Sequence, residues 1–404
     1  MTSPADPARE RVSPPRVLLV ASHPIQYQAP WFRALAASGE LDLCVLFVQQ
    51  PDARQQGRGF GIAFEWDVPI LEGYRWQRVP ELRGPGGLKG FFAARIADPV
   101  ALLRDHDPDV VLITGWHAWA LVQMLLAASR LRIPVVMRGE SNALRQRPWP
   151  TRLLHRLLLR RCAAFLPIGK ASHQFYRGYG MPEQVLFDTP YFVDNDRFTR
   201  SAQESLPKRP ALRERWHIPP AAFCFCYAGK LEPKKRILDL LAALRIAAGK
   251  TDARLHLLVV GTGELMERAQ AEATQHALPV TFAGFLNQSE IAAAYVAADC
   301  LVLPSDYGET WGLVVNEAMA CGKPAIVSDR VGCGPDLVTE GATGAVFPFG
   351  NIAALAERLV WLASNPLRAR EMGAAAHERV LHEYSVQQST QGTLRAIRSV
   401  APRP

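Results

Sequence analysis

The sequence predicts an α/β protein with two doubly wound domains, each a parallel sheet covered by helices on both faces. Short apolar runs alternate with helical segments in two successive series along the 404 residues. A polar segment with two prolines, residues 199–210, separates the series and is expected to be the linker. The length agrees with two domains, because it exceeds that of an ordinary single domain.

The first series predicts an amino-terminal domain at residues 16–200. Helices are expected at about 30–37 and 119–130. A strand, a helix and a second strand open the domain, which implies a parallel sheet. Residues 51–90 are rich in Gly, Arg and aromatic side chains and are expected to form long loops with short strands. Strands are expected at 17–20, 43–48, 110–113 and 134–137, with further short ones at 162–168 and 185–187.

The second series predicts a carboxy-terminal domain at residues 206–385. Its strands are expected at 223–228, 255–260, 280–282, 300–304 and 325–328. Residues 1–15 are polar and are expected to form a disordered leader. Ligands of doubly wound sheets bind outside the carboxyl ends of the strands, so the cleft between the two domains is the expected site.

The composition describes a globular protein, with 49% apolar and 21% charged residues. No apolar run approaches the roughly 20 residues of a membrane span, and the amino terminus lacks the apolar core of a secretory signal. Seven cysteines, a sparse and odd count, suit reduced thiols, so a cytoplasmic location is expected. Cys224 and Cys226 lie in an apolar strand and are expected in the core. The net charge is +8, but no nucleic-acid motif accompanies it, and no nucleic-acid partner is expected.

Two glutamates, Glu309 and Glu317, stand eight positions apart across a turn and the start of a helix. The expected strand 300–304 precedes them, and Gly322 with Pro324 ends the helix. Unpaired N–H groups and a positive dipole at the start of the helix suit an anion such as a diphosphate. Glu309 could then reach hydroxyls of the group that carries the phosphate, and Glu317 could accept from a ribose diol.

A basic loop, residues 229–236, follows the first strand of the second series. Lys230 and Lys235 could neutralise the charge that gathers on a departing diphosphate. A solvated basic loop is the alternative for this segment taken alone. The next strand ends in Gly261-Thr262-Gly263, a turn that lets backbone approach a nucleotide.

Together these segments resemble the retaining glycosyltransferases of GT-B fold, and family 4 in particular (glycosyl transferases group 1). Glu309 and Glu317 match the E-x7-E motif of that family. Residues 229–236 are similar to its G-R-L-x-x-x-K-G signature, with Lys230 in place of Arg and Arg236 in place of Gly. The resemblance covers about 225–350. It implies two Rossmann-like domains facing each other across a cleft, with a last helix at about 386–402 packed back on the first domain.

The resemblance implies transfer of a sugar, with retention, from a nucleotide diphosphate sugar to a hydroxyl acceptor: a glycan, a lipid-linked intermediate or a small molecule. No metal and no other cofactor are expected. Lys230 and Lys235 would hold the diphosphate, Glu309 the sugar hydroxyls and Glu317 the ribose. Glu309, His117 and Lys235 are the catalytic candidates. Further donor contacts are expected from Gly261, Gly263, Phe285, Thr310, Trp311, Gly312 and Leu313.

The first domain supplies fewer signals, and four of its residues are candidates. His23 follows the first strand and could be catalytic, acceptor-binding or structural. His117 follows the strand 110–113, where family 4 enzymes commonly carry a His near the donor sugar, or it could merely cap a helix. Arg138 and Glu140 end the next strand and are acceptor-side candidates. The base, the sugar and the acceptor do not follow from the sequence.

Arg152, Arg156 and Arg160 repeat every four residues, with four leucines, at 153, 154, 157 and 158, on the other side. This pattern predicts a basic amphipathic helix. A solvated arginine face over a leucine face buried in the core is one interpretation. A peripheral contact with an anionic membrane, on its cytoplasmic face, is the other.

Two other functions share these features. A GT-B sugar-nucleotide epimerase would bind the same ligand without an acceptor. A non-catalytic sugar-nucleotide-binding protein would keep the fold and lose the chemistry, although the four intact residues Glu309, Glu317, Lys230 and Lys235 argue against it.

Overall fold

The computed structural model describes residues 13–84 and 90–402 and contains two six-stranded sheets. Every pairing in both sheets is parallel. Both sheets have the same order: counted along the chain within each six-stranded sheet, the first strand lies beside the fourth, so each sheet has one topological switch point. The predicted fold class, two doubly wound α/β domains in GT-B arrangement, is confirmed. Most of the predicted leader, residues 1–12, lies outside the described residues.

The first sheet has the order β3-β2-β1-β6-β7-β8. Its strands are β1 (Arg16–Ala21), β2 (Asp42–Phe47), β3 (Trp76–Arg78), β6 (Val110–Ile113), β7 (Val135–Met137) and β8 (Ala164–Phe165). A separate antiparallel pair joins β4 (Leu82–Arg83) to β5 (Arg95–Ile96). The helices of this domain are α1 (Ala29–Ala37), α2 (Ala53–Gln56), α3 (Pro99–His106), α4 (Trp119–Arg130), α5 (Trp149–Leu159) and α6 (Lys170–Gly178).

The strands of this sheet are buried on both faces, which explains why they are continuous apolar runs. On one face Leu18 and Val20 of β1 pack with side chains of α3, α4 and α6. On the other face Val17 and Leu19 pack with α1 and with Leu394 and other residues near the carboxy terminus. The core of the first domain therefore needs a segment that is more than 350 residues away in sequence.

The second sheet has the order β11-β10-β9-β12-β13-β14. Its strands are β9 (Phe223–Ala228), β10 (Leu255–Val260), β11 (Val280–Gly284), β12 (Cys300–Leu303), β13 (Ala325–Ser328) and β14 (Gly344–Phe347). Alternate residues of β9 face opposite layers: Phe225 and Tyr227 pack with α9 and α14, whereas Cys224 and Cys226 pack with α11 and α12. The core position predicted for these two cysteines is confirmed, and all seven cysteines are free thiols.

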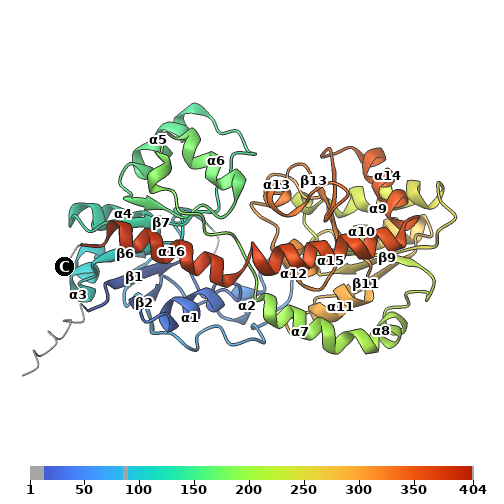
Figure 1. The fold of residues 1–404 in the computed structure, drawn as a ribbon, viewed down its shortest axis with the longest axis horizontal. Coiled ribbons are helices and arrows are strands. Elements are labelled where there is room, and N and C mark those ends of the chain that lie inside the picture. Colours follow the sequence, from blue (N-terminus) through green and yellow to red (C-terminus); the bar gives the residue numbers. More distant parts are fainter. Residues whose placement is uncertain (1–12, 85–89, 403–404) are drawn as a thin grey trace, which may run out of the picture.

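The helices of the second half complete both domains. They are α7 (Asn195–Ser205), α8 (Arg209–Arg215), α9 (Ile237–Ala248), α10 (Met266–Gln275), α11 (Ile291–Ala297), α12 (Leu313–Ala320), α13 (Gly334–Leu337), α14 (Ile352–Ala363), α15 (Pro366–His382) and α16 (Val386–Val400). Figure 1 shows α15 and α16 nearly end to end, running from the second domain onto the first. There α16 packs against α1. Within the described residues, no helix combines the length and apolarity needed to cross a bilayer.

The prediction that residues 199–210 form a linker is wrong, because most of this segment is helical. Residues 199–205 belong to α7, and 209–215 form α8. Pro207 lies at the start of a short 3-10 helix, Leu206–Lys208, and Pro210 lies at the start of α8. The first N–H groups of a helix have no partner within it, so a proline there loses no hydrogen bond. Phe198 of α7 is fully buried in the core of the second domain. The expected strand at 185–187 is reduced to one bridge between Phe165 and Leu186.

Candidate functional site

The candidate site lies where the switch points of the two sheets face each other. In the first domain, β1 leads into Ser22 and His23, and β6 leads into the turn that carries His117. Both histidines line a pocket of about 350 Å³ with Tyr27, Glu140 and Ser141, and Thr310 of the second domain closes one side. We call this cavity the first-domain pocket. It brings three of the four candidates of this domain together.

The two histidines of the first-domain pocket are held neutral. Burial, together with a smaller effect of the nearby His117, lowers the pKa of His23 to about 4. Burial also lowers the pKa of His117, although Glu140 acts in the opposite direction. The Ser22 hydroxyl is 2.9 Å from Nδ1 of His23, which helps to fix the ring. Neutral imidazoles can donate and accept hydrogen bonds, as sugar hydroxyls require.

Glu140 joins the first domain to the loop of Glu309. The Tyr191 hydroxyl donates to Oε1 of Glu140, and the Thr310 hydroxyl donates to Oε2 over 3.2 Å. Asn142 adds a second contact across the cleft, because its side-chain amide donates to the backbone oxygen of Thr310 over 2.9 Å. The carboxylate is thus oriented by hydroxyls from two segments that lie far apart in the sequence.

Arg138 is not at the cleft edge, where it was expected. It does not line the first-domain pocket, and only 4% of the residue is exposed. Its guanidinium carbon lies 4.8 Å from the ring centre of Trp31 and 4.7 Å from that of Tyr191. Stacking between aromatic rings compensates part of the cost of burying this charge. Arg138 therefore supports Tyr191, the residue that in turn binds Glu140.

In the second domain, Lys235 and Glu309 form an ion pair between Nζ and Oε2. Both side chains are only 14% exposed. Ser305 after β12 donates a 3.3 Å hydrogen bond to the same carboxylate oxygen of Glu309. The pairing confirms that the basic loop and the acidic loop, 74 residues apart, meet at the switch point of the second sheet.

Glycines bring these loops close together. A Cβ at Gly261 would lie 2.0 Å from the backbone oxygen of Gly229, and one at Gly263 would lie 2.7 Å from that of Leu231. Both have positive φ, which other residues adopt at a cost. Their observed task is therefore to pack the turn after β10 under the basic loop. Arg236, where the resemblance leads one to expect Gly, also has positive φ (56°) and is held by two hydrogen bonds to Asp239.

A segment of the first domain, residues 52–67, lies over part of this surface. The Lys230 ammonium is 4.8 Å from the centre of the Phe60 ring and 3.5 Å from the backbone oxygen of Arg58. Phe285, at the turn after β11, packs against Phe60 and Phe64, with ring centres 5.0 Å and 4.4 Å away. The loops expected for this segment are thus a cover for Lys230 and Phe285.

The remaining donor candidates shape the turn ahead of α12. Trp311 is buried, and its indole N–H donates to Oδ1 of Asn316 over 2.7 Å. Gly312 has φ of 103°, and a Cβ there would lie 2.9 Å from the side chain of Leu303. Leu313 begins α12, so the helix start points at the loop that holds Glu309 and Thr310.

Glu317 is buried within α12, where the Tyr295 hydroxyl donates to its Oε2 over 2.7 Å. It lines a second cavity of about 340 Å³, which also touches Tyr27, Arg197 and Gln288. We call this cavity the Glu317 pocket. Tyr27 borders both cavities, so the two pockets lie on either side of one side chain. Burial raises the pKa of Glu317.

We expect Glu317→Gln to stabilise the fold near pH 8. Because the pKa of Glu317 is higher in the folded than in the unfolded state, ionising this side chain lowers the free energy of unfolding. This loss begins as the pH rises above about 4.3, the usual pKa of a glutamate in an unfolded chain. Glutamine does not titrate and still accepts from Tyr295, so the gain, about 0.5–2 kcal/mol, should shrink toward pH 4. Thermal melts across this pH range measure it, with the exposed Glu267→Gln as the matched control. A loss of stability at pH 8 would contradict the prediction.

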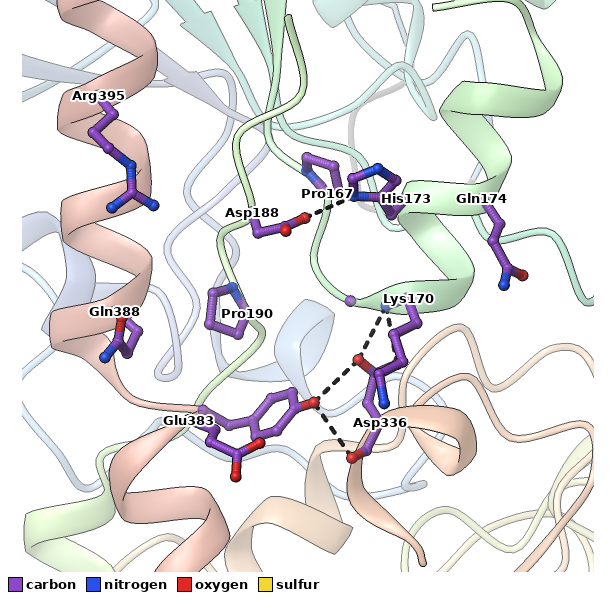
Figure 2. Close-up of a pocket in the computed structure, with 12 residues that line it drawn as sticks. Pro167, Lys170, His173, Gln174, Asp188, Pro190, Asp336, Glu383, Gln388 and Arg395 are labelled. Atoms are coloured by element: carbon purple, nitrogen blue, oxygen red, sulfur yellow. Dashed lines mark hydrogen bonds and ion pairs between the residues drawn. The ribbon is translucent and has the colours of Figure 1, made fainter. Parts of the chain in front are cut away.

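A larger cavity, of about 510 Å³, lies between α6, α13 and α16 and contains none of the predicted residues (Figure 2). Asp336 accepts from the backbone N–H of Lys170 over 3.0 Å and from the Tyr384 hydroxyl over 3.2 Å. Nδ1 of His173 is 2.8 Å from Asp188. Figure 2 shows the contact of Asp188 with His173 on one side of the cavity and that of Asp336 with Lys170 on the other. The contact between Lys170 and Asp336 ties the two domains together, and we assign the chemistry to the other cavities.

Sequence reasoning missed Tyr27, Asn142 and Tyr191, and it missed the role of Phe60 and Phe64. None stands in a recognisable motif, since each acts by meeting a residue that is distant in the sequence. The aromatic content of residues 51–90 was the one available signal, because exposed loops seldom carry so many rings.

Two family models match the chain in succession. The model described as glycosyl transferase 4-like domain matches residues 24–187, and that of glycosyl transferases group 1 matches residues 208–379. The first match covers the first-domain pocket except Ser22, His23 and Thr310, and the second covers the loops of Lys235 and Glu309.

Two curated relatives are similar over part of the chain. One is the GDP-mannose-dependent monoacylated alpha-(1-6)-phosphatidylinositol monomannoside mannosyltransferase of Corynebacterium glutamicum, 31% identical over 48% of this chain and 51% of the relative. The other is a D-inositol 3-phosphate glycosyltransferase of Streptomyces bingchenggensis, 34% identical over 51% of this chain and 46% of the relative. The chain thus spans about half the length of these relatives.

The fold is shared by solved structures at low identity. A glycosyltransferase of Rickettsia africae superposes with a TM-score of 0.73 at 15% identity. The match covers 97% of this chain and all of the other. The two-domain architecture is therefore shared over the whole described chain, while the identity is too low to carry more than the fold.

Proposed function

Because the chain belongs to the glycosyl transferases of group 1, we propose that it moves a sugar from a nucleotide diphosphate sugar to a hydroxyl acceptor. The observation that supports this most is the ion pair between Lys235 and Glu309 at the switch point of the second sheet. In this proposal Lys235 is the cation for the diphosphate and Glu309 the carboxylate for the sugar, and their ion pair lies where doubly wound sheets bind ligands. The name of the Corynebacterium relative, which specifies GDP-mannose, agrees with a donor of this class.

In this proposal the diphosphate lies between the basic loop and the start of α12, where Lys235, Lys230 and the helix dipole face it. Glu317 accepts from the ribose inside its pocket. Glu309 binds hydroxyls of the donor sugar. The sugar then projects toward the first-domain pocket, where the neutral His23 and His117 offer hydrogen bonds and Glu140 faces the acceptor.

The transfer is proposed to retain the anomeric configuration. The bond from the anomeric carbon to the diphosphate breaks, and the acceptor oxygen bonds to that carbon from the same face. The acceptor proton passes to the departing phosphate oxygen, so nucleoside diphosphate and glycoside are the products. Lysine side chains that stabilise the leaving charge lower the barrier of this step. Proton NMR of the first product, before any anomeric exchange, tests the stereochemistry.

A thermal-shift panel of UDP-, GDP-, ADP- and TDP-sugars tests the donor class, because a ligand bound only by the native state raises the melting temperature. With the donor so identified, release of nucleoside diphosphate is measured with and without hydroxyl acceptors. Acceptor-dependent release supports the transferase. Conversion of the sugar without any acceptor would indicate an epimerase, and binding without turnover a non-catalytic protein.

Turnover is expected to need no divalent metal. Lys230 and Lys235 neutralise the diphosphate, a task that a metal ion performs in other sugar transferases. Activity measured with excess EDTA should therefore stay within about twofold of the untreated rate, a difference below 0.5 kcal/mol in the barrier. Loss of activity with EDTA and its recovery with magnesium or manganese would overturn this expectation.

A further inference from the structure

The outer face of α5 carries a patch of exposed large apolar side chains. Trp149 is 75% exposed, and Leu153, Leu154 and Leu157 are 51%, 56% and 46% exposed. We call these four residues the α5 face. The helix is attached to the core of the domain through Leu159, which is 1% exposed, and through the partly buried Leu158 and the His155 ring. In Figure 1, α5 stands with α6 at the outer edge of the first domain.

The exposed leucines decide between the two interpretations of the sequence pattern. A leucine face buried in the core, with arginines in solvent, would leave residues 153–157 with little exposure. In the structure the three leucines 153, 154 and 157 are exposed beside the solvated arginines, and of the four only Leu158 packs against the core, so that interpretation is wrong. Large apolar side chains gathered on one helix face of a soluble domain mark a surface with a partner.

The chain segment that contains α5 carries charge of one sign. Residues 141–182 contain no Asp or Glu. They contain basic residues at eight positions, of which all but Arg147 are exposed: Arg145, Arg147, Arg152, Arg156, Arg160, Arg161, Lys170 and Arg177. An anionic partner therefore meets attraction over the whole segment.

We propose that the α5 face docks on an anionic phospholipid bilayer, with its apolar side chains in the interface and its arginines at the lipid phosphates. A bilayer offers apolar interior and negative charge together, which is what a basic amphipathic helix with Trp and Leu on one face requires. In a dimer formed through this helix, the arginines of one copy would face those of the other, and like charges at an interface oppose association.

The docking helix is connected to the site by a short hydrogen-bonded segment. Arg147 donates to the backbone oxygen of Asn142 over 3.0 Å, and Asn142 donates to Thr310 over 2.9 Å. Ser141 lines the first-domain pocket. If the proposed transfer holds, a bilayer-docked enzyme keeps this pocket near the lipid surface, which favours an amphiphilic acceptor. Only this last step rests on the proposed function.

Co-sedimentation of the full chain with vesicles tests the docking without any need for activity. We expect binding to vesicles of phosphatidylcholine with phosphatidylglycerol at low salt, and little binding to phosphatidylcholine alone. Replacing Leu153 and Leu154 with Glu should reduce the partition coefficient at least about tenfold, and so should Arg152→Glu, Arg156→Glu and Arg160→Glu together. Thermal melts should show every variant folded, because all five side chains are exposed.

Matched controls lie in the second domain. Leu206 and Leu367 are exposed to similar degrees, and their double replacement by Glu should leave vesicle binding unchanged. Arg254, Arg268 and Arg370 are exposed, so their triple replacement by Glu makes the same change in net charge. If the control triple variant and the α5 triple variant lost vesicle binding equally, net charge alone would explain the binding, and the proposal would be overturned. Absence of wild-type binding to anionic vesicles would also overturn it, as would a dimer that only the α5 variants dissociate.

Discussion

Glu309→Gln should leave the fold intact and lower turnover about 100-fold at saturating donor, the usual loss when one transition-state contact is removed. Glutamine keeps the shape of the side chain and can still accept from Ser305, 3.3 Å away. It removes the charge that pairs with Lys235 and that orients the sugar hydroxyls in the proposed complex. Steady-state release of nucleoside diphosphate measures the effect, and the melting temperature reports on the fold.

Glu232→Gln is the matched control, because Glu232 belongs to the basic loop but pairs with Lys234 at a more exposed position. Its turnover should stay within about twofold of wild type, since exposed ion pairs contribute little. A Glu309→Gln variant that also stayed within about twofold would remove Glu309 from the catalytic step. A parallel loss in both variants would point to the charge of the loop as a whole.

The sequence contained enough to predict the two sheets and the residues at their switch points. Buried parallel strands are continuous apolar runs, and loops after them reach one edge of the sheet whatever their spacing in the sequence. Lys235 and Glu309 could be placed together for this reason. The sequence does not decide whether His23 or His117 is the histidine of the cleft, and in the structure both line the first-domain pocket. Lys235 and Glu309 come close because the loops that carry them follow β9 and β12, which are neighbours in the sheet.

What could not be predicted depends on the distance between segments. Glu140 is oriented by Tyr191 and Thr310, and neither partner is near it in the sequence. Arg138 has the residue type of a cleft cation, but neighbouring rings enclose it. The prolines of residues 199–210 mark helix starts as readily as linkers, and only the burial of Phe198 distinguishes the two. The exposure of the α5 face is likewise a property of tertiary packing, which the helical period leaves open.

Lys235→Ala should weaken binding of the nucleoside diphosphate far more than binding of the free nucleoside. A charged hydrogen bond to phosphate contributes roughly 1.5–3 kcal/mol, so we expect an affinity loss of about 10- to 150-fold for the diphosphate. The nucleoside has no phosphate for Lys235 to contact, and its affinity should change less than about twofold. Calorimetry with both ligands, chosen from the donor panel, measures the difference.

Lys234→Ala provides the control, since Lys234 is the neighbour of Lys235 and pairs with Glu232 in solvent. It should change neither affinity appreciably. Combining Lys235→Ala with Glu309→Gln adds a second test, because residues that form one ion pair lose less together than the sum of their separate losses. If the diphosphate and the nucleoside lost affinity equally in Lys235→Ala, the lysine would serve only to hold Glu309. The phosphate would then have to be held by Lys230 and the start of α12 without a contact from Lys235.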